Sequence, residues 1–140
     1  MFLTEKFVHF GDCDPGGIMF NANLLRYAHE AYEMFIFNVA DYPEYYLNKQ
    51  IAYPIMNTET RFAYPFFCGT YFDVELGISK LQEHSFEVTY YFYDKSRKLL
   101  AKAKTVHVAL DLNTLEKTEL PVKLREKLNL HLMKQDRDNN

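Results

Sequence analysis

The chain has 140 residues, of which 48% are hydrophobic and 16% aromatic, and its formal net charge is −3. This length and apolar content suffice for the core of one domain. The negative charge and the scattered basic residues argue against a nucleic-acid-binding protein. No run approaches the roughly 20 apolar residues that a membrane span needs. We therefore expect that the protein binds neither nucleic acid nor a membrane.

The cysteines and the N-terminus indicate the compartment. Cys13 and Cys68 are too few for a disulfide framework. Residues 1–6 lack the basic and apolar regions of a secretion signal. We therefore expect a cytoplasmic protein with a single domain at residues 1–134 and a polar tail at 135–140.

The N-terminal part of the chain predicts a strand, a loop and a helix. An apolar run from Phe2 to Phe10 indicates the strand, and the glycine-rich residues 11–17, which include Pro15, indicate the loop. The helix begins near Asn21 or Asn23, whose short side chains are good N-terminal caps. Its buried face is expected to contain Leu24, Ala28, Ala31, Phe35 and Val39. So little of this helix is polar that we expect a curved sheet to cover most of its sides.

Further along, the apolar residues alternate, which predicts strands. Residues 43–49 are compatible with one or two further helical turns. The expected strands are residues 51–62, 71–81, 86–93 and 99–111. Pro121 then opens the last expected helix, residues 122–132. Short connections favour antiparallel neighbours. The sequence thus predicts an α+β fold in which an antiparallel sheet of about five strands wraps around a long central helix. Its long aromatic edges favour pairing between subunits.

The loop carries the strongest candidate for a reactive group. Asp14 lies just before a helix, where unpaired backbone N–H groups can stabilise an oxygen that becomes negative. A carboxylate there can act as a nucleophile or as a general base, but Asp before Pro also caps turns. Gly16 and Gly17 would allow the backbone to approach a substrate closely.

Neighbouring polar residues have structural interpretations. Asp12 is expected to hold the loop through hydrogen bonds. Cys13 is expected to be a buried thiol, because four residues of strand separate it from His9 by about 13 Å, too far for a catalytic pair. A calcium loop that starts at Asp12 is rejected, because Asn23 stands where the required Glu should be.

Two motifs resemble a known family. The run from Phe10 to Phe20, FGDCDPGGIMF, resembles the signature of 4-hydroxybenzoyl-CoA thioesterase-like members of the hotdog-fold superfamily. Residues 62–70, FAYPFFCGT, are similar to the family's Pro-x-x-x-Gly-Asp turn after the second strand, with Thr70 where Asp is common. A weaker match is Leu120-Pro121 before the last helix. The resemblance covers nearly the whole chain in element order.

The resemblance implies an acyl-CoA thioesterase in which Asp14 is the catalytic carboxylate. The backbone N–H of Asn21, where some relatives carry His, would polarise the thioester carbonyl. The expected substrate-binding residues are Gly16, Gly17, Phe20 and Tyr64. The family further implies a homodimer or a dimer of dimers, with sheets joined edge to edge and active sites near the boundary. Coenzyme A is then part of the substrate, and no other cofactor and no metal is expected.

Alternatives remain open at this point. The thioester could be held by a carrier protein, or the fold could bind acyl groups without catalysis; a dehydratase is disfavoured because the loop offers Asp14 instead of His. His29 and Glu30 could face the site, but a surface role is the simpler interpretation. No adjacent partner of His84 or His107 suggests a metal site. The basic residues that could meet coenzyme A phosphates are not assigned: Arg97, Lys98, Lys102 and Lys104.

Overall fold

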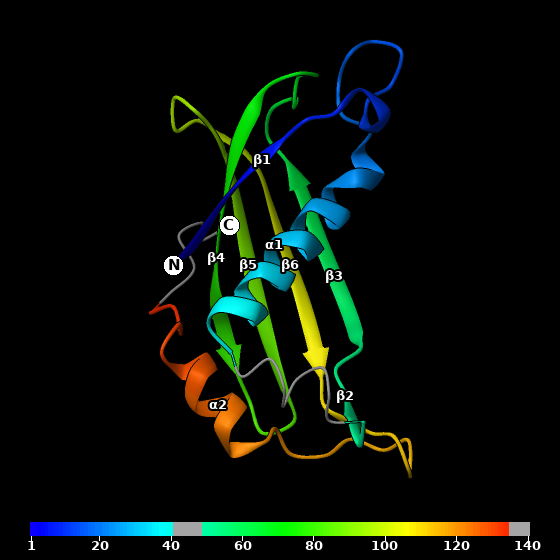
Figure 1. Cartoon of the computed structure of the whole chain (residues 1–140), viewed down its shortest axis with the longest axis vertical. Coiled ribbons are helices and arrows are strands. Elements are labelled where there is room, and N and C mark those ends of the chain that lie inside the picture. The colour runs from blue at the N-terminus through cyan, green and yellow to red at the C-terminus, as the bar shows by residue number, and fades with distance from the viewer. Residues whose placement is uncertain (41–48, 135–140) are drawn as a thin grey trace.

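A computed structural model describes residues 1–40 and 49–134. Within these residues, a five-stranded antiparallel sheet has the strand order β1-β4-β5-β6-β3, as Figure 1 shows. Its strands are β1 (Phe2–Phe7), β3 (Ile55–Phe62), β4 (Tyr71–Leu81), β5 (Ser85–Asp94) and β6 (Leu99–Val108). Two short strands, β2 (Ile51–Ala52) and β7 (Leu110–Asp111), pair separately. The predicted α+β class with an antiparallel sheet of five strands is confirmed.

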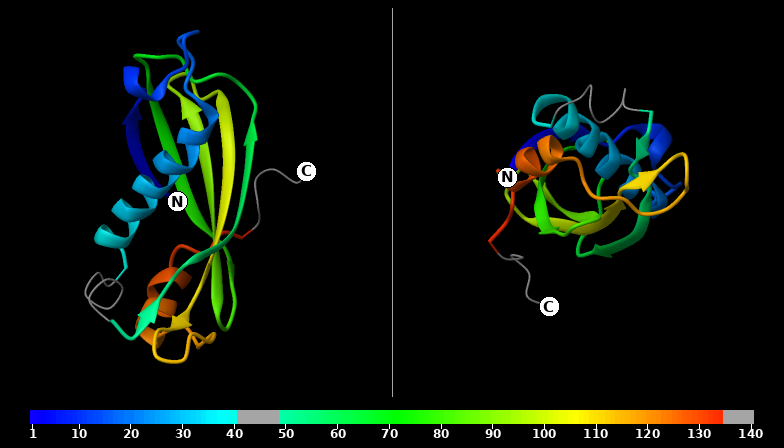
Figure 2. Two further views of the ribbon diagram at one scale, coloured as in Figure 1. Left: turned by 90° about the vertical axis from the view of Figure 1, so that its right-hand side faces the viewer. Right: turned by 90° about the horizontal axis from the view of Figure 1, so that it is seen from below.

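The main helix, α1 (Leu24–Asn38), lies against one face of the sheet, and the views in Figure 2 show the sheet curving around it. With the 3₁₀ turn η2 (Asn21–Asn23) before it, the helical segment has only 18 residues, so it is shorter than the long helix we expected. The face turned to the sheet is buried as its spacing predicts: Leu24, Tyr27, Ala28, Ala31, Tyr32, Phe35 and Ile36. On its other side Met34 and Phe37 remain about half exposed, so the sheet does not cover most sides of the helix.

Two predicted strands are each divided in the structure. The expected strand at 51–62 breaks at Pro54, which has no backbone N–H, and its carbonyl accepts a bond from Val108 N at 3.1 Å. The expected strand at 99–111 breaks at Ala109, whose N–H donates to His84 O. The short strands beyond both breaks, β2 and β7, pair with each other.

The ends of two further elements also differ from the prediction. β1 stops at Phe7 because residues Phe10–Asp12 form a 3₁₀ turn, η1. The last helix, α2 (Val122–Asn129), ends before residue 132 because the chain there pairs with the bulge of β4. Ile78 N donates to His131 O, and Met133 N donates to Ile78 O. Residues 43–48 of the expected helical turns and the polar tail at 135–140 lie outside the described residues.

The edge strand β3 and the central strand β5 differ in how much of their surface is buried. Every residue of β3 is exposed, including the apolar side chains of Ile55, Met56 and Phe62. The central strand β5 instead buries the alternating residues that its sequence predicts: Phe86, Val88, Tyr90 and Phe92. In the part of the chain that the structure describes, no helix is long and apolar enough to cross a membrane.

Candidate active site

The two motifs of the sequence, residues 10–20 and 62–70, lie side by side at one end of the sheet, although 41 residues separate them. Backbone hydrogen bonds join the loop at residues 8–20 to the β3–β4 connection at residues 63–70. Val8 N donates to Thr70 O at 3.0 Å, and Gly69 N donates back to Val8 O at 2.8 Å. Further along, Met19 N–Phe66 O and Cys68 N–Gly17 O are both 2.8 Å. These bonds fix the loop through its main chain.

Asp14 closes a tight turn within this loop and is exposed. Its Oδ1 accepts hydrogen bonds from Gly16 N at 2.9 Å and from Ile18 N at 3.3 Å. Asp14 N donates to Ile18 O, and Gly17, with a φ of 78°, donates its N–H to Asp14 O. A Cβ on Gly16 would lie 3.2 Å from Asp14 Oδ1, closer than such atoms normally approach. The carboxylate therefore has one oxygen held by the backbone, and Oδ2 has no hydrogen-bond partner among the described residues.

The helical segment begins at Asn21 and α1 follows Asn23, as predicted, but the expected side-chain caps are absent. Neither side chain caps the helix. Asn23 Nδ2 donates instead to Asp12 O at 2.9 Å, and Phe20 N donates to the same carbonyl. Asn21 is the first residue of the 3₁₀ turn. Its backbone N–H therefore has no carbonyl acceptor within the helical segment.

A cavity of about 350 Å³ opens beside this helix start. Asn21 and Tyr64, two of the predicted site residues, line it together with Ile18 and apolar residues of the β3–β4 connection. Phe20 is 54% exposed, and the lining includes none of Asp14, Gly16, Gly17 or Phe20. Asp14 is nevertheless connected to the lining, because its Oδ1 accepts the N–H of Ile18.

Asp12 is a structural residue of the loop. Its Oδ2 accepts a 2.5 Å hydrogen bond from the Tyr27 hydroxyl and pairs with Arg26 at 2.6 Å. The Tyr27 hydroxyl, and after it Arg26, lower the pKa of Asp12. Arg26 also pairs with Glu30 at 2.6 Å, and Lys6 does so at 3.2 Å. Asp12 and Glu30 are thus occupied in ion pairs that join α1 to the loop and to β1.

Cys13 lacks the properties of a nucleophilic thiol. Its Sγ lies 3.4 Å from the carbonyl oxygen of His9. Burial, and after it the neighbouring Cys68 thiol, raises the pKa of Cys13 to about 11. At neutral pH the group is therefore a protonated thiol, which is a poor nucleophile. It is partly exposed, so the expectation of a buried thiol is wrong in degree.

A second cavity, of about 390 Å³, was not predicted from the sequence. It lies between the β3–β4 connection and the β5–β6 turn, and its walls include Tyr64, Phe67, Tyr71 and Leu100. Tyr64 belongs to the lining of both cavities. The many aromatic residues at 62–72 were the only feature of the sequence that pointed to this cavity. Its other wall, the β5–β6 turn, is brought against them by the fold.

The turn at the end of the second motif, just before β4, has the backbone conformation that its glycine allows. Gly69 has a φ of 78°, a conformation that glycine adopts without strain. Thr70, which replaces the Asp common in the family, donates its hydroxyl to Phe67 O at 2.6 Å. Among residues 1–40 and 49–134, no group of three His, Cys, Asp or Glu side chains could hold a metal ion.

Comparison with known proteins decides the family. The sequence profile of the Thioesterase-like superfamily matches residues 8–128 of the chain. The chain belongs to this superfamily. The match includes both motifs, the whole of the loop from Val8 onward, and α2 nearly to its end. It confirms the resemblance from which a thioester hydrolase was expected.

Relatives of this thioesterase-like protein extend over most of its length. The 1,4-dihydroxy-2-naphthoyl-CoA hydrolase of Thermosynechococcus vestitus is 32% identical over 84% of this chain and 81% of its own. The hydrolase of the same name from Crocosphaera subtropica is 33% identical, over 87% and 91%. The crystal structure of a 1,4-dihydroxy-2-naphthoyl-CoA thioesterase from Synechocystis superimposes with a TM-score of 0.84 at 28% identity and covers 91% of this chain and 95% of that one. These similarities confirm the hotdog fold.

Proposed function

We propose that this protein hydrolyses the thioester of an acyl- or aryl-CoA, with Asp14 as the catalytic carboxylate. The observation that carries the proposal is the position of Asp14. The carboxylate is fixed through Oδ1 on the loop that forms one wall of a cavity beginning at the helix start, while its Oδ2 has no partner among the described residues. The names of the related hydrolases support the same reaction class.

The proposed reaction uses a carboxylate on one side of the thioester and a hydrogen-bond donor to its carbonyl oxygen on the other. As a nucleophile, Asp14 would attack the carbonyl carbon and expel coenzyme A as a thiolate, which leaves a mixed anhydride that water then hydrolyses. As a general base, it would take a proton from the water that attacks. In either route the backbone N–H of Asn21 would stabilise the carbonyl oxygen as it becomes negative. Gly16 and Gly17 allow the substrate close to the main chain.

The walls of the cavities favour an aromatic acyl group. The rings of Phe62, Tyr64 and Phe66 line the cavity that also contains Asn21. Flat rings pack well against aromatic side chains, and the related hydrolases carry a naphthoyl substrate in their names. We propose Tyr64 and the partly exposed Phe20 as residues that contact the acyl group.

The direct test is a hydrolysis screen of the purified protein. It compares short, long and aromatic acyl-CoA esters with the same acyl groups on a carrier protein, and free thiol is measured. Preferred turnover of the aryl-CoA ester is expected. Turnover of only carrier-bound esters would instead support the carrier-protein alternative, and binding without turnover of any ester would support an acyl-binding protein.

The exposed strand β3 supports a homodimer whose sheets join edge to edge. An uncovered strand with apolar side chains along it is a pairing surface. β3 ends at Phe62, which lines the cavity beside Asn21, so a second subunit on this edge would lie next to the proposed active site. We propose that the site is completed at this boundary. Whether two dimers associate further, and the cytoplasmic location, stay predictions.

Placing a charge on β3 should weaken the dimer. Met56 is 66% exposed, so Met56→Asp changes little in the single subunit but opposes burial against a partner strand. Light scattering after size exclusion is expected to give a dimer or larger assembly for the natural protein. For Met56→Asp it should give a shift to monomer, with association at least ~10-fold weaker. Leu130→Asp, at a 75% exposed position after α2, is the control and should assemble normally. A natural protein that is monomeric would refute the proposed dimer.

Cys13 is expected to be dispensable for the chemistry. Since its thiol is protonated at neutral pH, Cys13→Ser removes no nucleophile and should keep most of the turnover number. Thiol release from the preferred aryl-CoA ester, followed at pH 7 for both proteins, measures this. Loss of nearly all turnover in a folded Cys13→Ser protein would mean that the thiol, and not Asp14 alone, takes part.

A further inference from the structure

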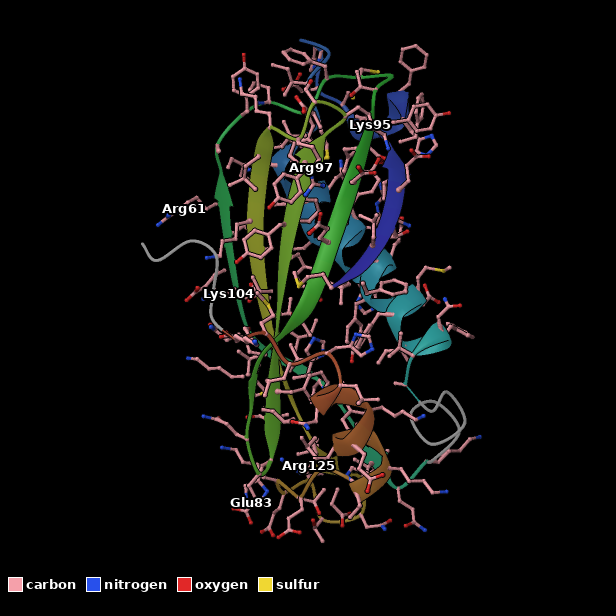
Figure 3. The ribbon with its side chains drawn as sticks, turned by 90° about the vertical axis from the view of Figure 1, so that its left-hand side faces the viewer. Arg61, Glu83, Lys95, Arg97, Lys104 and Arg125 are labelled. Atoms are coloured by element: carbon pink, nitrogen blue, oxygen red, sulfur yellow. The ribbon has the colours of Figure 1, made fainter. Side chains whose placement is uncertain are left out.

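The β5–β6 turn presents three cations at the end of the sheet where the candidate site lies (Figure 1). Two of them are already paired. Lys95 Nζ contacts Glu5 and Asp73, the latter at 2.7 Å. Arg97 pairs with Glu75 at 2.6 Å. Figure 3 shows both side chains near the ends of the central strands.

Lys98 is different from these two. Its Nζ has no carboxylate partner among the described residues and lies 3.2 Å from the centroid of the Tyr64 ring. An ammonium over an aromatic face is held only weakly at an exposed position. The contact positions the charge but leaves N–H donors for an anion. Tyr64 lines both cavities, so this charge stands over a ring that the two cavities share. Lys98 itself is in neither lining, whereas Asp94 and Lys95 of the same turn line the second cavity.

The backbone of the turn fixes where Lys98 begins. Asp94 Oδ1 accepts the N–H groups of Ser96 and Lys98, each at 2.9 Å, and Asp94 N donates to Lys98 O. Arg97 between them has a φ of 67°, which lets the turn close. The carboxylate of Asp94 is thus directed at the backbone of the turn. It is the acidic group of this segment, and it holds Lys98 in place through main-chain bonds.

We propose that Lys98 binds a phosphate group of the coenzyme A part of the substrate. The inference rests on the proposed function, because it extends the acyl site near Asn21 to the other end of the same molecule. With the acyl group in the first cavity, the rest of the substrate passes Tyr64 toward the second cavity. Its phosphates then meet the cation that stands on that ring. A phosphate replaces the weak ring contact with a charge-assisted hydrogen bond, which is stronger.

Steady-state kinetics of three thioesters with one acyl group test the assignment. The thiols are coenzyme A, dephospho-coenzyme A, and N-acetylcysteamine, which has no phosphate. Lys98→Gln should raise KM for the coenzyme A ester about 10-fold at unchanged kcat, because binding to a remote phosphate is equal in the ground and transition states. KM for the N-acetylcysteamine ester should not change. Lys98→Arg, which keeps the charge, should restore KM. Lys123→Gln, at an exposed position on α2, should behave like the natural protein.

The dephospho-coenzyme A arm identifies the phosphate. If Lys98→Gln has no further effect on that ester, Lys98 binds the 3′-phosphate; if its effect persists, Lys98 binds the diphosphate. An unchanged KM for the coenzyme A ester, or an equal rise with N-acetylcysteamine, would overturn the proposal. Calorimetric titration with free coenzyme A separates the two hypotheses. Binding about 10-fold weaker in Lys98→Gln would support the phosphate contact even if no ester is hydrolysed, a result that would refute only the proposed function.

Discussion

Replacing Asp14 with Asn is expected to lower kcat for the preferred aryl-CoA ester by about 10³-fold or more, since a general base alone contributes up to about 10⁴. The fold should survive, because the side-chain carbonyl of Asn can still accept the N–H groups of Gly16 and Ile18. What the substitution removes is the negative charge and the basic Oδ2. The measurements are kcat by thiol release, and the melting temperature, which should change little.

Asp111 provides a matched control for this variant. Its Oδ1 also accepts two backbone N–H groups, from Asn113 at 2.7 Å and from Thr114 at 3.3 Å. Asp111 ends β7, however, which pairs with β2 at the end of the sheet opposite the Asp14 loop (Figure 1). Asp111→Asn should therefore keep the natural kcat. A folded Asp14→Asn protein with undiminished kcat would show that Asp14 only caps its turn, and the catalytic proposal would fail.

The second large effect is a loss of stability on acidification that depends on His107. The ring of His107 is 1% exposed and stacks between Tyr32, at 4.4 Å, and Phe86, at 5.0 Å. Its Nε2 lies 2.8 Å from Thr105 Oγ1. Burial lowers the pKa of His107 from 6.5 to about 4. The folded protein therefore keeps this ring neutral at pH values where the unfolded chain already binds a proton.

The sign follows from this difference. The unfolded state takes up the proton as the pH falls through 6.5, whereas the folded state does so only near pH 4. The free energy of unfolding should therefore fall by about 3 kcal/mol between these values. Urea unfolding at a series of pH values measures it. Asp12, with a lowered pKa, adds its own loss only below about pH 3.8, so the two effects occur in separate ranges.

His107→Phe isolates this contribution. Phe keeps the stacked ring, and Thr105 Oγ1 keeps its 3.0 Å contact with the Tyr90 hydroxyl. His131 also has a pKa lowered by burial, so part of the acid sensitivity should remain in the variant. The difference between the two proteins should be about 3 kcal/mol over this range. An identical pH dependence would contradict the assignment. NMR titration of His107 in the natural protein gives an independent value if the variant does not fold.

The strands and the core face of α1 could be predicted because their signals are local. In β5, the alternating Phe86, Val88, Tyr90 and Phe92 are all buried, as their spacing requires. The errors occur where distant bonds decide. β1 ends early because the chain turns at Phe10–Asp12 into the loop that bonds to residues 66–68, and α2 ends early because residues 131 and 133 pair with Ile78. No pattern within either segment contains that information.

The candidate site shows the same division. The loop with Asp14 is recognisable from its own residues, but only the fold shows its backbone hydrogen bonds to the β3–β4 connection. In the sequence, Lys98 is one member of a basic segment, and no pattern there separates it from Arg97. Only the fold places Lys98 on the ring of Tyr64 and places Arg97 beside Glu75.

The backbone bonds between residues 8–20 and 63–70 have a consequence for how such a protein can diverge. Because main-chain atoms hold the acidic turn, the side chains at Tyr64 and Phe67 can change without loosening it. Under the proposed function, descendants of one gene could therefore acquire wider, narrower or more polar acyl cavities by single substitutions while the Asp14 carboxylate stays in position. Selection for a new metabolite would then act on the cavity walls and leave that carboxylate in place.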